Sequence, residues 1–134
     1  MSAKPILLLA FLMTNPLIMT SPLMAEEAAS PSFISKDLAG VPGKEIEMYT
    51  VDFPPGHSIP AHRHNAQVFL YVLEGSLVTQ VKGGKEMTLT PGQSYYEAPD
   101  DIHTVTRNAS STKPAKFLVF MLKEKGAPST VMEK

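Results

Sequence analysis

Short segments typical of β-strands, separated by turn residues, occupy most of the chain after its first 44 residues. They are rich in β-branched and aromatic residues, and Pro, Gly or Asp residues mark their ends. No stretch keeps apolar residues at helical spacing for more than two turns. Seven or eight short strands without helices predict an all-β sandwich, jelly roll or closed barrel. The predicted strands are 45–53, 67–73, 76–82, 85–89, 94–97, 102–107 and 115–123.

The composition indicates one folded domain without a cluster of like charges. The 134 residues include 12 Lys and Arg against 13 Asp and Glu, and 43% are hydrophobic, which is enough to bury a core. Like charges do not cluster, so neither nucleic acid nor an anionic membrane is indicated as a partner, and a small molecule is expected. Cys is absent from the sequence, which excludes disulfides, thiolate zinc sites and thiol redox chemistry.

The first 25 residues differ from the rest and have the pattern of a secretory signal peptide. Lys4 precedes an apolar run over 6–13, and a small residue, Ala25, stands at the expected cleavage point. A retained membrane anchor is the alternative, but Pro16 breaks the apolar stretch well short of the roughly 20 residues that span a bilayer. We therefore expect a periplasmic or secreted protein. The predicted organisation is a signal peptide (1–25), an N-terminal arm (26–44), a β-barrel (45–123) and a C-terminal tail (124–134).

Histidine placement suggests a metal site. Of the four histidines, His62 and His64 stand two positions apart. In a strand, such residues point to the same face, so both imidazoles can be directed at one point. A pair of exposed strand histidines is the plain alternative. His57 lies in a loop rich in Pro and Gly, where surface exposure is expected.

The sequence around the histidine pair resembles the first motif of the cupin superfamily. Gly56, His62, His64 and Gly75 match that motif in residue type and spacing. The resemblance implies a double-stranded β-helix, which is a jelly-roll barrel, with the histidines inside it.

The second cupin motif is recognisable further along the chain. Its glycine, proline, histidine and asparagine correspond to Gly92, Pro99, His103 and Asn108, with the loop between them locally rearranged. Together the two motifs cover about residues 45–123. The resemblance implies that His103 is the third histidine ligand of the metal.

One departure from the first motif removes an expected ligand. The motif's metal-binding glutamate falls at Val68, which cannot coordinate a metal. The adjacent Gln67 is an alternative fourth ligand only if the strand is bulged, because its alternation otherwise places it on the opposite face. The remaining ligands are His62, His64 and His103, a set that suits zinc or non-haem iron; manganese and nickel stay open.

The chemistry of such a site depends on its metal. Iron would favour dioxygenase activity, whereas zinc, manganese or nickel would favour isomerase, lyase or decarboxylase activity on a small organic molecule. A non-catalytic module that binds a small molecule or the metal is the alternative, and a metal-free barrel that serves in assembly is a third hypothesis. The sequence assigns no catalytic residue.

Four residues near the second motif have simpler explanations. Tyr95 and Tyr96 are adjacent and point to opposite sides, so at most one can line a pocket, and core packing is the default for both. Asp100 and Asp101 are expected to be turn residues.

The strand 67–73 also bears on assembly. It carries apolar side chains on both faces, so Phe69, Tyr71 and Leu73 need cover outside the barrel. Residues 33–38 could supply part of it, and packing by the terminal segments is the alternative to a partner. We expect a homodimer.

Overall fold

The computed structural model describes residues 33–134, and every regular element in that range is a β-strand. The predicted signal peptide lies outside the described residues, as do residues 26–32 of the predicted arm. No helix within 33–134 is long and apolar enough to cross a membrane. The strands are β1 (Ile34–Asp37), β2 (Lys44–Phe53), β3 (His62–Arg63), β4 (Ala66–Glu74), β5 (Leu77–Val81), β6 (Met87–Leu89), β7 (Ser94–Glu97), β8 (Ile102–Asn108), β9 (Ala115–Glu124) and β10 (Val131–Met132).

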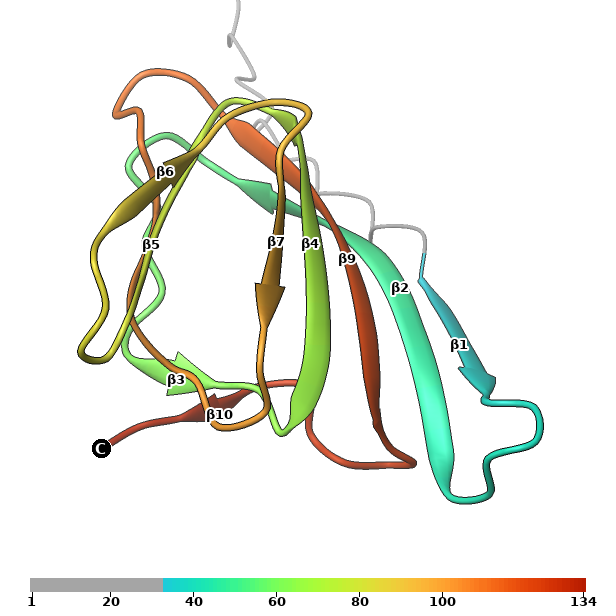
Figure 1. The fold of residues 1–134 in the computed structure, drawn as a ribbon. Coiled ribbons are helices and arrows are strands. Elements are labelled where there is room, and N and C mark those ends of the chain that lie inside the picture. The colour runs from blue at the N-terminus through green and yellow to red at the C-terminus, as the bar shows by residue number, and fades with distance from the viewer. Residues whose placement is uncertain (1–32) are drawn as a thin grey trace, which may run out of the picture.

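Two antiparallel five-stranded sheets form the walls of a double-stranded β-helix. The first sheet has the order β1-β2-β9-β4-β7 and the second has the order β10-β3-β8-β5-β6. Figure 1 shows β4 and β9 on one side of the barrel and β5 and β6 on the other, with β3 and β10 at one end. The all-β prediction is confirmed, and each of the seven strands predicted from the sequence is present.

The hydrophobic core lies between the two sheets. β9 pairs along its whole length with β2 on one side and with β4 on the other, and the three strands alternate buried and more exposed residues. This alternation follows from the period of two in a strand, which sends every second side chain into the barrel. The largest buried apolar side chains of these strands include Phe117, Met121, Val72 and Val68.

The expectation that strand 67–73 is buried on both faces is wrong for the single chain, because its outer face is exposed. Phe69, Tyr71 and Leu73 on the outer face of β4 are 47%, 44% and 45% exposed. The segment expected to cover them forms β1, which pairs with β2 at the far edge of the sheet. It extends this outer face sideways instead of lying on it.

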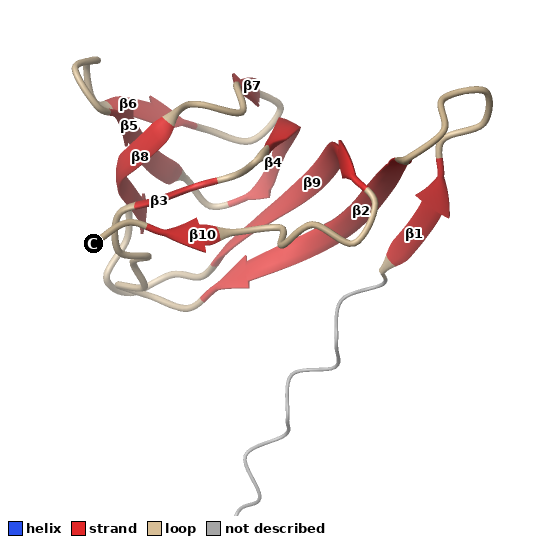
Figure 2. Cartoon of the chain, turned by 90° about the horizontal axis from the view of Figure 1, so that it is seen from below, coloured by secondary structure: helices blue, strands red, loops and turns tan. Residues whose placement is uncertain are grey.

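The C-terminal segment returns to the barrel. β10 pairs with β3, and the Glu133 amide donates a hydrogen bond to the Ala61 carbonyl (2.9 Å). An ion pair joins Arg63 to Glu133 at 3.0 Å. Figure 2 shows β10 lying beside β3, the strand that begins with the first histidine of the pair.

Two motif residues hold the loops of the barrel. Gly75 has φ +68°, and a Cβ there would come within 2.5 Å of the Pro114 carbonyl oxygen, so only glycine fits. The buried Asn108 side chain donates hydrogen bonds to the carbonyls of Phe53, Pro54 and Lys113. These contacts explain why the fold requires a glycine and an asparagine at these positions.

Candidate metal centre

Three imidazole rings meet at one end of the barrel. His62 on β3 and His103 on β8 are direct cross-strand partners, and their ring centroids are 5.3 Å apart. His64 follows β3, and its ring lies 5.1 Å from that of His62 and 5.7 Å from that of His103. His62 and His103 are 3% and 1% exposed. The structure thus brings together the three histidines singled out in the sequence.

A fourth residue, which the sequence analysis missed, completes this group. Glu97 ends β7, and its Oε2 atom lies 3.4 Å from His64 Nε2 and 3.5 Å from His103 Nε2. Glu97, His64 and His103 each offer one ligand atom, and these atoms lie within 4.8 Å of one another, a spacing that could hold a metal ion. One signal could have found this residue: Glu97 is the lone charged residue of the predicted strand 94–97.

Glu97 replaces Gln67 as the candidate oxygen ligand. β4 pairs regularly with β9 from Ala66 to Val72, so no bulge turns Gln67 inward, and its side chain is exposed on the outer face. Val68 points into the cavity beside the histidines, as the motif alignment predicts.

Burial disfavours the charged forms of the acid and the base at this centre. Burial, with a smaller contribution from Asp101, raises the pKa of Glu97 to about 7. Burial, followed by the nearby His62 and His64, lowers the pKa of His103 to about 4. The 3.5 Å contact between Glu97 and His103 is therefore not a stable ion pair near neutral pH.

The buried His103 ring fits a metal ligand. Neither of its nitrogens has a hydrogen-bond partner among the residues that the structure describes. An unsatisfied buried polar group costs about 1–3 kcal/mol, so a ring left in this state calls for a partner. A neutral imidazole with a free lone pair is the form that binds divalent metals. The donor set of His64, Glu97 and His103, with the His62 ring beside it, suits zinc, iron, manganese or nickel.

Backbone carbonyls orient the other two rings. His62 Nδ1 donates to the Pro60 carbonyl at 2.9 Å, and His64 Nδ1 donates to the Ser129 carbonyl at 2.6 Å. Because Nδ1 carries the proton in both rings, each Nε2 keeps its lone pair. In His64 this is the nitrogen that faces Glu97.

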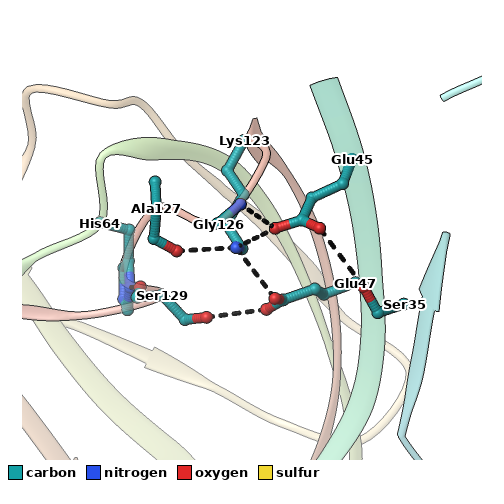
Figure 3. A network of polar contacts seen from close by, with 8 residues as sticks. All are labelled: Ser35, Glu45, Glu47, His64, Lys123, Gly126, Ala127 and Ser129. Atoms are coloured by element: carbon teal, nitrogen blue, oxygen red, sulfur yellow. Dashed lines mark hydrogen bonds and ion pairs between the residues drawn. The ribbon is translucent and has the colours of Figure 1, made fainter. Parts of the chain in front are cut away.

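A buried polar network connects His64 to the far side of the barrel (Figure 3). Ser129 Oγ donates to Glu47 at 2.7 Å, and Glu47 accepts from Lys123 Nζ at 2.9 Å. Lys123 also binds Glu45 at 2.5 Å and the Ala127 carbonyl at 2.7 Å. The hydrogen bond from Lys123 is the main cause that lowers the pKa of Glu45. The network therefore fastens the C-terminal segment, and with it the carbonyl that orients His64, to β2 and β9.

A cavity of about 220 Å³ opens beside the metal centre. Tyr49 lines it, and burial followed by the charges of Glu47 and Glu97 raises the pKa of this phenol to about 12, so the hydroxyl stays protonated. The polar lining residues are Tyr49, His62, His64, Glu97, Thr106 and Thr130, and the apolar ones are Val51, Phe53, Ile59, Val68, Leu70, Leu77, Phe117 and Val119.

The remaining residues considered in the sequence analysis lie outside this cavity. His57 is exposed and packs edge-on against Phe53. Tyr95 packs against the core, whereas Tyr96 is exposed on the outer face. Asp101 accepts a hydrogen bond from the Ala98 amide in the turn before β8, and Asp100 is exposed.

Two antiparallel sheets closed into a small barrel, with histidines of the neighbouring strands β3 and β8 at one end, are typical of the double-stranded β-helix class of proteins. The sequence matches the family described as "Cupin domain" over residues 49–121. The chain belongs to the cupin family.

Solved structures of similar fold share little sequence with this chain. A cupin-like protein from Thermotoga maritima has a TM-score of 0.58 and 17% identity, covering 77% of this chain and 74% of that one. The DMSP lyase DddQ from Ruegeria pomeroyi has a TM-score of 0.54 and 19% identity, and the match covers 88% of this chain and 59% of that one. A recombinant oxalate oxidase in complex with glycolate has a TM-score of 0.52 and 21% identity, and the match covers 80% of this chain and 57% of that one. No curated protein matches the sequence significantly.

Proposed function

We propose that this cupin binds one divalent metal ion through His62, His64, Glu97 and His103 and acts on a small organic molecule in the adjoining cavity. The observation that carries the proposal is the state of His103. This ring is fully buried, neither nitrogen has a hydrogen-bond partner in the described part of the chain, and the carboxyl group of Glu97 lies 3.5 Å away.

The residues around the site have separate roles. The carbonyls of Pro60 and Ser129 hold two rings with Nε2 free for coordination. Glu97 supplies the one anionic ligand. The Tyr49 hydroxyl, protonated at neutral pH, can donate a hydrogen bond to a substrate oxygen. When bound, the metal would polarise a substrate oxygen or, if it is iron, provide a site for molecular oxygen.

Dioxygenase, isomerase and lyase reactions are the candidate activities. Structures of the same fold include a DMSP lyase and an oxalate oxidase, so the fold accommodates both lyase and oxidative chemistry. The metal would select between them, iron favouring oxidation and zinc, manganese or nickel favouring isomerisation or elimination.

A non-catalytic binding module is the second candidate, and the cavity lining favours it. Besides the proposed ligands, Tyr49 is the only ionisable side chain among the described residues that line the cavity. A phenol with a pKa of about 12 is a poor general base at neutral pH. Turnover by the metal-loaded protein would decide for the enzyme.

We also propose that the protein is exported to the periplasm or beyond the cell. The basis is the sequence pattern of residues 1–25, which resembles a signal peptide. The N-terminal sequence of protein secreted or released from the periplasm would test this, and an N-terminus that still begins at Met1 would contradict it.

Elemental analysis of untagged protein tests the metal site. We expect one equivalent of metal per chain in the wild type and a large loss in Glu97→Gln and His103→Ala. Gln67→Ala and His57→Ala are matched controls, since both side chains are exposed outside the cavity, and should keep the metal. Circular dichroism verifies folding. A folded wild type that takes up none of anaerobic iron, zinc, manganese or nickel would overturn the proposal.

A further inference from the structure

The polar groups of the cavity are unevenly distributed. His62, His64 and Glu97 define its metal end, and Thr130 lies there too, with its hydroxyl 3.5 Å from His64 Nδ1. Tyr49 stands two positions after Glu47 on β2, and Glu47 belongs to the same cross-strand row as Val68 and Glu97, so Tyr49 is near this end of the sheet. The other residues within 33–134 that line the cavity are apolar except for Thr106, which carries one hydroxyl.

A break in strand register turns Thr106 into the cavity. His103 and Thr106 are three positions apart on β8, so in a regular strand they would point to opposite faces. The pairing of β5 with β8 shifts, with Gln80 opposite Val105 but Val81 opposite His103, which leaves Thr104 as an extra residue. This bulge lets both side chains face the interior.

The Thr106 hydroxyl has no hydrogen-bond partner within residues 33–134. Its oxygen is buried and makes no hydrogen bond, although it borders the cavity. At about 3.3 Å per residue, it lies roughly 10 Å along the strand from His103. A polar group on a ligand that reaches from the metal end could satisfy it.

The net charge of the proposed metal site limits the charge of the molecule that can bind there. A divalent metal with one carboxylate ligand, Glu97, and three neutral imidazoles carries a net charge of +1. One anionic oxygen head group neutralises this charge. No Lys or Arg is among the described residues that line the cavity, so a second negative charge would be buried without a counter-charge.

We propose that the cavity selects a small monoanionic molecule whose oxygen head group binds the metal and whose apolar body carries one uncharged polar group toward Thr106. This substrate class rests on the proposed metal site. Dicarboxylates are excluded from it by charge. Thr106 is then a specificity residue that discriminates between bodies with and without the polar group.

Three benzene carboxylates that differ only at the para position test the proposal by calorimetric titration of metal-loaded protein at pH 7.5. Relative to benzoate, 4-hydroxybenzoate should bind about fivefold more tightly, which corresponds to one additional hydrogen bond. Terephthalate, which differs by a second carboxylate, should bind at least about tenfold more weakly.

Two variants on β8 complete the test. Thr106→Val, close in shape but without the hydroxyl, should abolish the advantage of 4-hydroxybenzoate over benzoate. Thr104→Val is the matched control, because Thr104 is exposed and bonds the Gln80 carbonyl. It should preserve the advantage.

The outcomes separate this inference from the metal site itself. Metal content is measured first in every sample, and absence of metal contradicts the proposed function. If metal is present, three results overturn the substrate class: no binding of benzoate or 4-hydroxybenzoate at millimolar concentration, equal affinity for terephthalate, or a hydroxyl advantage that survives in Thr106→Val.

Discussion

Glu97 stands directly opposite Val68 in the pairing of β7 with β4. Val68 occupies the position where the first cupin motif has its glutamate, and both side chains are buried inside the barrel. The carboxylate is therefore displaced by one strand, to a neighbour about 5 Å away in the sheet, and still faces the same histidines.

Placing the carboxylate at position 68 instead of position 97 should preserve a metal site. Glu97→Val should lower metal affinity by at least about 100-fold, since it removes the anionic ligand. The double variant Val68→Glu/Glu97→Val should recover much of that loss. Competition titration with a chelating dye measures both. A double variant no better than Glu97→Val would contradict the alignment of Val68 with the ligand position.

The C-terminal segment should control metal affinity through His64. A chain ending at Pro128 lacks the Ser129 carbonyl that holds His64 and lacks β10. We expect metal affinity to fall by about 10–100-fold. Removing Lys134 alone is the control. Equal affinities for both truncated chains, each verified as folded, would show that this segment does not orient the ligand.

Lys123 should be a major determinant of stability. Lys123→Met leaves the buried carboxylates of Glu45 and Glu47 without their cation. The melting temperature should fall far more than in Lys116→Met, which breaks an exposed ion pair with Asp52 worth about 0–1 kcal/mol. Thermal unfolding followed by circular dichroism compares them, and similar losses would refute the prediction.

Acid should weaken the same cluster. The pKa of Glu45 in the folded protein is lowered, chiefly by Lys123. Its contribution to stability is therefore complete above the ordinary pKa near 4.5 and is lost as the pH falls through the lower folded value. Urea unfolding between pH 6 and pH 3 should show a smaller loss of stability in Lys123→Met than in the wild type. Identical pH dependence would contradict this assignment.

We propose that a second copy of the chain covers the outer face of the first sheet. One row of apolar side chains crosses all five strands without a charged residue, and an isologous contact would bury it on both copies. Burying each large side chain contributes about 1.5–3 kcal/mol. The row consists of Ile34, Met48, Phe120, Phe69 and Tyr96.

Sedimentation equilibrium tests this assembly. The wild type should sediment as a dimer and Phe69→Glu as a monomer. Met87→Glu, which alters an exposed apolar residue of the second sheet, should remain dimeric. A wild-type chain that is monomeric at all concentrations would contradict the dimer and favour cover by the chain's own terminal residues.

Local patterns in the sequence determined the strands and the histidine pair. Alternation and turn residues depend on neighbours within a few positions, so segments such as 45–53 and 115–123 could be placed from the sequence. The spacing of His62 and His64 places them on one face for the same reason. His103 was found because its position relative to Gly92 and Pro99 resembles a family motif.

Only the tertiary structure decided the oxygen ligand and the support of the site. Whether Glu97 meets the histidines depends on which strand pairs with β4 and in which register, and nothing local to residues 94–97 fixes that choice. The bulge that turns Thr106 inward and the return of Ser129 to His64 depend in the same way on contacts between distant segments. Strand alternation specifies two faces, but long-range pairing determines which residues share a cavity.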